Sequence, residues 1–210
     1  MEKRFTIKKG KHYFKGLKFQ EITYPLFFIL LSGAFFISNS INDIFGWISI
    51  GLSALFWVFF YFKMKDINIK VKFDKSCLYD PLDNEHDINK LWGMGFVHHH
   101  KNSARFGWRC MTIGKNKIIE IHAYCYIDGK RVSEKLIECM PNEWVELDLD
   151  VLKDRYQFKA QNIDGERALK FIPKGDTRFL QLFTYKLFPY FGGNNAAPHD
   201  MEMTIIETEK

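Results

Sequence analysis

The sequence lacks the short motifs that identify most catalytic centres. It contains no nucleophile elbow, P-loop, dinucleotide-binding glycine fingerprint or paired-carboxylate pattern. The four cysteines at positions 77, 110, 125 and 139 are widely spaced, with neither a CxxC pair nor metal-ligand spacing. Free cysteines are therefore expected, and no cofactor is predicted. Nothing in these residues favours an enzyme, although the sequence does not exclude one.

Charged side chains are absent from two long runs, residues 22–41 and 44–62, which only Asn42 and Asp43 separate. Each run is close to the ~20 apolar residues that a helix needs to cross a bilayer. The pattern predicts a transmembrane helical hairpin over residues 22–62, with the lipid bilayer as partner and a homo-oligomer as a further option. A secretory signal or a pair of buried helices fits less well, because the first run begins late and neither has a polar face.

Lysine and arginine flank this hairpin on both sides and are absent from its turn. The positive-inside rule then predicts a multi-pass protein of the bacterial inner (plasma) membrane with both termini cytoplasmic. Residues 1–21 become a basic cytosolic flank, and residues 66–210 become one soluble domain of ordinary size. The net charge of +5 follows largely from these flanks. No nucleic-acid polymer is therefore expected as a partner.

Alternating apolar and polar residues predict strands throughout residues 66–210. Residues 67–73, 119–127 and 144–151 alternate most clearly, and the pair Asp128 and Gly129 is a strong hairpin signal. The connections are too short for helical crossovers, so the sheets are expected to be antiparallel. The predicted fold is an N-terminal two-helix transmembrane hairpin followed by an all-β domain. That domain is an antiparallel β-sandwich of jelly-roll or concanavalin-like type, or alternatively a closed β-barrel.

A histidine run is the first candidate for a functional site. His98 and His100 would share one face of a strand, and with His199 and Asp200 from a later loop they could bind zinc or iron. The alternative is an ordinary polar strand end. No metal is therefore predicted, and His98, His100 and His199 are only weak candidates for metal ligands.

A second candidate comprises Asn102, Arg105, Trp108 and Arg109. Arginine offers a two-pronged fork for phosphate or carboxylate, and tryptophan offers a flat face for stacking. The alternative is that both arginines pair with acids on a neighbouring strand while Trp108 lies in the core.

The third candidate is the loop at residues 189–200, which contains two adjacent glycines. Glycine permits a close backbone approach, and asparagine offers both donors and acceptors. The alternative is a rigid corner held by its prolines. No catalytic residue is predicted, and the predicted ligand-binding residues are His98, His100, Asn102, Arg105, Trp108, Arg109, Tyr190, Asn194, His199 and Asp200.

Three resemblances accompany these residues. The segments HHHKNSARFGWRC and YKLFPYFGGNNAAPHDMEMTI resemble a pattern in uncharacterised bacterial membrane-associated or lipoprotein-like β-domain proteins, which implies no activity. The PYFGG corner before the last strand resembles concanavalin-like sandwiches and implies a fold alone. In layout, the predicted hairpin and β domain are similar to membrane effectors of bacterial nucleotide-triggered antiphage systems, whose β-barrel binds a cyclic nucleotide. That last likeness is a fold-level analogy.

The sequence therefore predicts a membrane-anchored cytosolic binding module that recognises a small polar or anionic ligand or a protein partner. Two alternatives stay open. One is a cyclic-nucleotide-triggered membrane effector of antiphage defence. The other is a carbohydrate-binding or metal-dependent enzyme domain.

Overall fold

The computed structural model describes residues 2–12, 66–80, 87–96, 98–175, 184–193 and 195–208. The chain divides into two units, one made of residues 1–16 and 64–210 and the other of residues 17–63. All described residues belong to the first unit, and they form eleven strands and one short 3-10 helix. The regular secondary structure of the described part of the chain is therefore almost entirely β.

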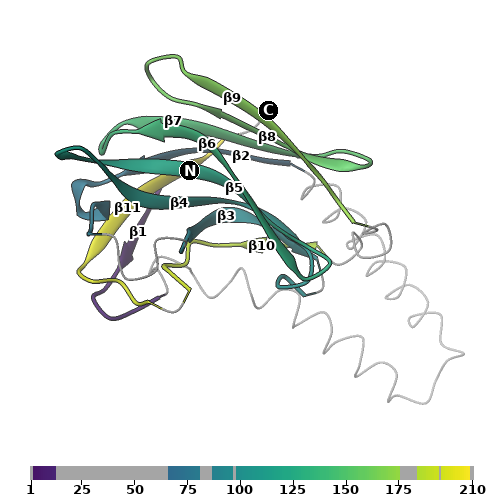
Figure 1. Cartoon of the computed structure of the whole chain (residues 1–210), viewed down its shortest axis with the longest axis horizontal. Helices are drawn as coiled ribbons and strands as arrows, with labels where there is room; N and C mark the ends of the chain where they lie inside the picture. Colours follow the sequence, from purple (N-terminus) through teal and green to yellow (C-terminus); the bar gives the residue numbers. More distant parts are fainter. Residues whose placement is uncertain are drawn as a thin grey trace, which may run out of the picture. The chain divides into compact units, whose positions relative to one another are not determined.

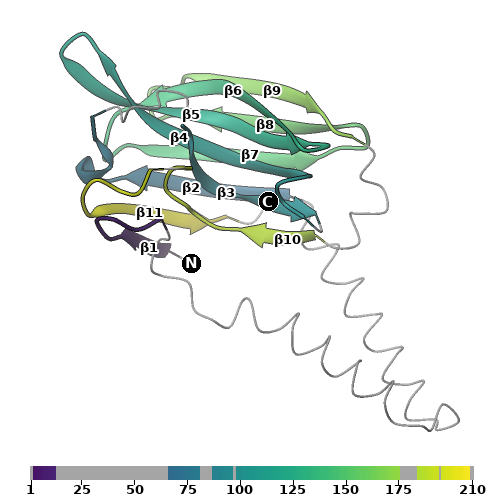
Figure 2. The same cartoon turned by 60° about the horizontal axis from the view of Figure 1, so that its bottom comes forward.

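Two antiparallel sheets make up this unit (Figures 1 and 2). Sheet A contains, in spatial order, β1 (Glu2–Ile7), β11 (Met201–Glu207), β2 (Asp66–Phe73), β7 (Trp144–Val151), β8 (Arg155–Gln161) and β9 (Arg167–Pro173). Sheet B contains β10 (Thr184–Leu187), β3 (Asn89–Phe96), β4 (Ser103–Ile113), β5 (Asn116–Ile127) and β6 (Lys130–Cys139). The helix η1 (Lys75–Cys77) follows β2.

The core lies between the sheets, because the apolar member of each alternating pair turns toward the opposite sheet. Phe106 of β4 meets Phe158 of β8 edge to face, with 5.3 Å between ring centroids. Trp108 of β4 lies 5.2 Å from Phe73 of β2 by the same measure. Both contacts join one sheet to the other, which is the packing of a β-sandwich. Since Phe106 and Trp108 face inward, the residues that alternate with them on β4, Arg105, Gly107 and Arg109, face away from sheet A.

The predicted hairpin at Asp128 and Gly129 is confirmed. These residues have φ angles of 50° and 81° and connect β5 to β6. Two successive positive φ angles make the turn type that matches the twist of the paired strands, and aspartate followed by glycine adopts them readily.

The alternative of a closed barrel is wrong. In the described residues each sheet ends in two edge strands, β1 and β9 in sheet A and β10 and β6 in sheet B. A barrel would instead require a single sheet closed on itself. The sandwich prediction is the one that the structure confirms.

The prediction of a transmembrane helical hairpin is corrected. Across the described ranges, no helix has the length and apolar character to span a membrane. The single helix there, η1, has three residues, whereas a span needs ~20. The multi-pass description and the inner-membrane location with cytoplasmic termini are corrected on the same finding. The segment that carried the prediction, residues 22–62, lies outside the described residues.

A strand also occurs within the predicted basic flank, residues 1–21. β1 runs antiparallel to β11, with Lys3 opposite Ile205. Phe5 and Ile7 of β1 are 1% and 0% exposed, so they belong to the core. The flank therefore contributes an edge strand to sheet A.

Candidate functional site

The outer face of sheet B, which is the face turned away from sheet A, gathers polar and aromatic side chains in rows. Arg105 on β4 stands opposite Gly93 on β3 and Tyr124 on β5. Directly opposed residues in antiparallel strands share a face. The next row contains Ser103 opposite Gly95. Glycine at these β3 positions leaves room for the side chains of the neighbouring strands.

Two further tyrosines lie in the row that contains Ser103 and Gly95. Tyr126 on β5 stands opposite Ser103, and Tyr185 on β10 stands opposite Gly95. A Cβ added at Gly95 would lie 2.9 Å from the Cζ atom of Tyr185, so the tyrosine ring covers this glycine. Tyr124 and Tyr126 contact each other with 5.8 Å between ring centroids.

Arg105 lies within this aromatic group as a buried cation. Its exposure is 7%, and its Nε atom is fully buried without a hydrogen-bond partner. Within the described ranges no acid forms an ion pair with it. Burial lowers the pKa of Arg105 to about 10, although the nearby phenol groups of Tyr124, Tyr185 and Tyr126 oppose the shift. A positive charge is thus largely shielded from water, and no described residue supplies a counter-charge.

Ser103 provides a second unsatisfied polar atom on the same face. The residue is 0% exposed, and its Oγ atom has no hydrogen-bond partner in the part of the chain that the structure describes. Buried polar groups in folded proteins nearly always have a partner, so each exception needs an explanation. Ser103 and Arg105 are two residues apart on one strand, and their side chains therefore point the same way.

His99 borders this group in the turn between β3 and β4. Its backbone N–H donates to the hydroxyl of Tyr185 at 3.1 Å, and its Nδ1 atom lies 2.8 Å from the same oxygen. Burial, together with the positive fields of His100, Arg105 and His98, lowers the pKa of His99 to about 4. His100 stacks edge to face on Tyr126, with 5.8 Å between ring centroids.

Lys90 on β3 brings a second cation to the face. Its ammonium nitrogen lies 5.5 Å from the ring centroid of Tyr124 and donates to the carbonyl of Gly192 at 2.7 Å. Its distance to Asp87 Oδ1 is 3.7 Å. Burial lowers the pKa of Lys90; Asp87 opposes this shift, while the charge of Arg105 adds to it.

The predicted loop at residues 189–200 forms a corner that is held from within the protein. The Gly192 N–H donates to Asn89 Oδ1 at 2.6 Å, and Gly193 donates to Asp87. Tyr190 makes an isolated β-bridge with Lys90. These bonds match the interpretation of the loop as a rigid corner, with side chains rather than prolines holding it. Asn194 lies outside the described residues.

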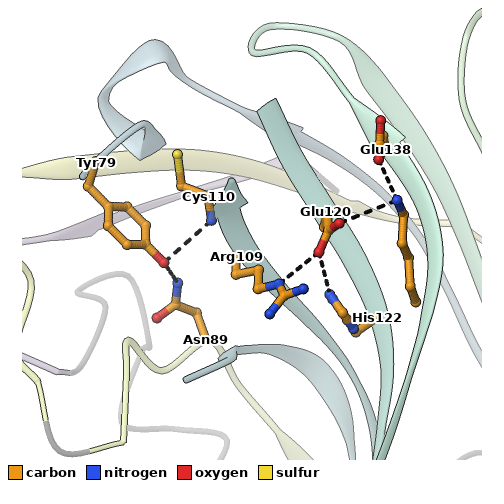
Figure 3. Close-up of polar contacts among 8 residues, drawn as sticks. Tyr79, Asn89, Arg109, Cys110, Glu120, His122 and Glu138 are labelled. Atoms are coloured by element: carbon orange, nitrogen blue, oxygen red, sulfur yellow. Dashed lines mark hydrogen bonds and ion pairs between the residues drawn. The ribbon is translucent and has the colours of Figure 1, made fainter. Parts of the chain in front are cut away.

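Arg109, the second arginine of β4, has an acidic partner (Figure 3). Its Nε atom donates to Glu120 on β5 at 2.7 Å, and His122 Nε2 lies 3.2 Å from the same carboxylate oxygen. Lys135 contacts the other oxygen at 3.3 Å and also pairs with Glu138. Burial raises the pKa of Glu120, but the bonds and charges of its partners outweigh burial and hold the pKa below its usual value. Arg109 therefore belongs to a paired network.

Trp108 lies in the core, where it is 0% exposed. Its ring contacts Phe73, Tyr79 and Phe191. Figure 3 shows that the hydroxyl of Tyr79 in turn meets Asn89, at 2.8 Å. Trp108 thus occupies the position that the alternative interpretation gave it.

The remaining predicted residues lie in three places. His98 and His100 are exposed in the turn after β3. Asn102 in that turn accepts a hydrogen bond from the backbone N–H of Asp128 at 3.2 Å. His199 contacts the carbonyl of Ser76 at 2.8 Å. Asp200 accepts from the ammonium of Lys8 at 2.6 Å and from the backbone of Lys9 at 2.9 Å.

No metal centre connects these histidines. In the part of the chain that the structure describes, no group of three or more His, Cys, Asp or Glu side chains could hold a metal ion. The structure therefore brings the histidine run close to Arg105 but gives His199 and Asp200 separate partners.

Sequence reasoning missed Ser103, Tyr124, Tyr126, Tyr185 and His99. One signal was available. Tyr124 and Tyr126 lie on the polar side of the alternating run at residues 119–127, where a solvated strand would carry smaller or charged side chains. Two aromatic residues on that side indicate a covered or functional outer face.

Comparison with known proteins assigns no family. No family model matches, and no curated protein matches the sequence. A functionally unknown protein from Saccharomyces cerevisiae is similar in structure, with 11% identity, a TM-score of 0.40, and coverage of 67% of this chain and 64% of that one. Scytalido-glutamic peptidase with a peptide-based transition-state analogue is also similar. It shares 8% identity at a TM-score of 0.33, over 67% of this chain and 58% of that one.

The GH43 protein BlXynB from Bacillus licheniformis is a third similar structure. It shares 10% identity at a TM-score of 0.35, over 67% of this chain and 26% of the enzyme. This chain spans less than two thirds of each of the three structures. At these scores none of them carries an activity or a ligand over to this protein.

Proposed function

We propose that this β-sandwich is a ligand-binding module whose outer face on sheet B recognises a small anionic group. Arg105 supports the proposal most strongly, because the residue is only 7% exposed and no acid in the described residues forms an ion pair with it. The penalty for burying an uncompensated charge is several kcal/mol. A bound anion would offset this penalty.

The surroundings of Arg105 suit such a ligand. A guanidinium donates two parallel hydrogen bonds to a carboxylate or a phosphate. Hydroxyls of tyrosine and serine can donate to the remaining oxygens of the ligand. The low local dielectric strengthens each of these interactions. The face therefore supplies a positive charge, the oriented donor pair of the guanidinium, and several hydroxyl donors within one small area.

Binding can be tested with simple oxyanions. The full chain is titrated with sodium sulfate at constant ionic strength while its thermal unfolding is followed. Ligand binding to the native state raises Tm as concentration rises. We expect a saturable rise in wild type and none in Arg105→Gln.

Arg4→Gln serves as the matched control, because Arg4 is an exposed arginine on strand β1 of the other sheet. We expect it to respond to sulfate as the wild type does. Equal sulfate responses of all three proteins would contradict the proposal, because a general salt effect does not depend on Arg105.

The other predicted functions fare differently. The resemblance to cyclic-nucleotide effectors depended on a β-barrel, which two open sheets replace, and it is not carried further. A carbohydrate-binding role stays a prediction. The metal-dependent version has no cluster to support it in the described ranges.

A further inference from the structure

We infer that the group recognised at Arg105 is a phosphoryl group, as in inorganic phosphate or a phosphate monoester. This inference depends on the proposed anion site and goes further by naming the chemistry of the ligand. Three features of the outer face of sheet B favour a phosphoryl group over a carboxylate or a neutral sugar. They are the lack of an available carboxylate acceptor among the described residues, the number of positive charges, and the presence of donors for three ligand oxygens.

The charged groups around Arg105 are cations, and the hydroxyls beside them can donate as well as accept. Neutral sugars present hydroxyls that both donate and accept, so their sites usually combine amide or guanidinium donors with carboxylate acceptors. Two acids on or beside this face already have partners. Asp87 accepts from the Gly193 N–H and contacts Lys90, and Glu120 is held by the Arg109 network. A ligand made only of acceptor oxygens fits this arrangement better.

More than one positive charge acts on the site. The charge of Arg105 lowers the pKa of Lys90, so the two cations lie within electrostatic reach of each other. Arg131 on β6 contributes to the same field. A carboxylate carries one negative charge, whereas a phosphate monoester carries about −1.5 to −2 near neutral pH. Asp87, 3.7 Å from the Lys90 ammonium, offsets part of this field, and a dianion compensates the remainder more completely than a monoanion.

The donor groups also suit three terminal oxygens. The arginine fork can bind two oxygens, and the hydroxyl of Ser103, which has no partner in the described structure, can donate to a third. Tyr126 stands opposite Ser103 and adds another hydroxyl to this row. A carboxylate has only two oxygens, so the Ser103 hydroxyl would have to share an oxygen with the arginine fork.

The test compares matched ligands by isothermal titration calorimetry on the full chain. Phenyl phosphate and benzoate share a ring and differ in the charged group, and methyl glucoside represents a neutral sugar. Inorganic phosphate and glycerol phosphate distinguish a free ion and an aliphatic ester from an aromatic ester. All titrations are made near pH 7.5 and at one ionic strength.

We expect phenyl phosphate to bind at least about tenfold more tightly than benzoate, since one extra charge-assisted hydrogen bond contributes about 1.5–3 kcal/mol. We expect methyl glucoside not to bind. Ser103→Ala should weaken phenyl phosphate binding more than benzoate binding, because it removes the donor for the third oxygen. Lys90→Gln should reduce the preference for phosphate, whereas Lys170→Gln should leave it unchanged, because Lys170 is a half-exposed lysine on β9 of the other sheet that pairs with Glu134.

Benzoate binding as tight as phenyl phosphate binding, or saturable binding of methyl glucoside, would overturn the inference while Arg105 remained a ligand site. The proposed function itself would be overturned if no tested anion bound, or if Arg105→Gln left anion binding unchanged. The two failures are thus separable in one set of titrations. Ser103→Ala removes a single buried oxygen, which keeps the test usable if Lys90→Gln disturbs the corner at Gly192.

Discussion

Arg105 occupies the space that a side chain at Gly93 would fill. The two residues stand opposite each other on β4 and β3, and a Cβ atom added at Gly93 would lie 2.1 Å from the Cβ of Arg105. It would also lie 2.5 Å from the carbonyl oxygen of Ala104. The position of the arginine therefore depends on the absence of a side chain on the neighbouring strand.

Gly93→Ala should both destabilise the protein and weaken anion binding. The added methyl meets backbone atoms that cannot rotate away, and overpacking of this kind costs about 3 kcal/mol. Gly165→Ala is the control, because Gly165 has a φ of +83° but no neighbouring atom within 4 Å. Its strain should cost about 1 kcal/mol and leave sulfate binding intact. Urea unfolding measures the first effect and calorimetry the second.

Arg105→Met should stabilise the protein while it abolishes anion binding. Methionine keeps much of the arginine volume and removes the buried charge, so the free energy of unfolding should rise by about 1–3 kcal/mol. Arg4→Met, at an exposed position, should change it by less than about 0.5 kcal/mol. A clear loss of stability in Arg105→Met would mean that the charge has a partner in the native protein. Chemical denaturation of both variants without added anion decides between these outcomes.

Glu120→Gln should destabilise the protein by about 2–3 kcal/mol at pH 7, because three cationic or polar partners lose a charged acceptor. The folded pKa of Glu120 lies below its ordinary value of 4.5. Its contribution is therefore fully present above pH 4.5 and is lost as the pH falls through the folded pKa.

The difference in unfolding free energy between wild type and Glu120→Gln should shrink on acidification over that interval. Glu146→Gln, which disrupts an exposed pair with Lys70, should cost less than about 1 kcal/mol. A gap between wild type and Glu120→Gln that stays constant with pH would contradict the assigned ionisation.

Sulfate should raise the pKa of His99. Its folded pKa is about 4 against an ordinary value of 6.5, lowered by burial and by the charges of His100, Arg105 and His98. The hydroxyl of Tyr185 is its direct contact. An anion at Arg105 cancels part of the positive field, which favours the protonated imidazole. Binding should therefore tighten as the pH falls from 6.5 toward 4, since a ligand that raises a pKa binds the protonated form better.

NMR titration of the histidine ring protons, with and without sulfate, measures this effect. Sulfate is suitable because it stays doubly charged across the range. The His199 signal is an internal reference, because His199 contacts the Ser76 carbonyl instead. Identical His99 titrations in both conditions would separate His99 from the anion site. The Arg105→Gln variant should show no sulfate effect.

The strands of the sandwich could be predicted because most have one buried face. β7 begins and ends where the predicted strand at residues 144–151 does. A period of two survives wherever one side of a sheet packs on the core. β1 was missed because only Phe5 and Ile7 mark its buried side. The surrounding lysines favoured the interpretation of residues 1–21 as a basic cytosolic flank. Its partner β11 lies at the other end of the chain, where no local pattern could identify it.

The candidate site could be predicted only in part. Arg105 and Arg109 share a face of β4, and the sequence offered both a ligand and an acid as partners for the pair. The register of β4 and β5 distinguishes them, with Glu120 opposite Arg109 and Tyr124 opposite Arg105. That register follows from the short turn at residues 114–115, where Ile113 pairs with Asn116.

The pairing of β1 with β11 sets the order in which the protein can assemble during synthesis. β11 lies between β1 and β2, and its Glu207 contacts Lys3, a residue 204 positions earlier. At roughly 5–20 residues per second, the ribosome needs roughly 10–40 s to make the intervening chain. During that time β1 has no strand to pair with, and β2 has an open edge. Sheet A is therefore finished last, after every strand of sheet B has left the ribosome.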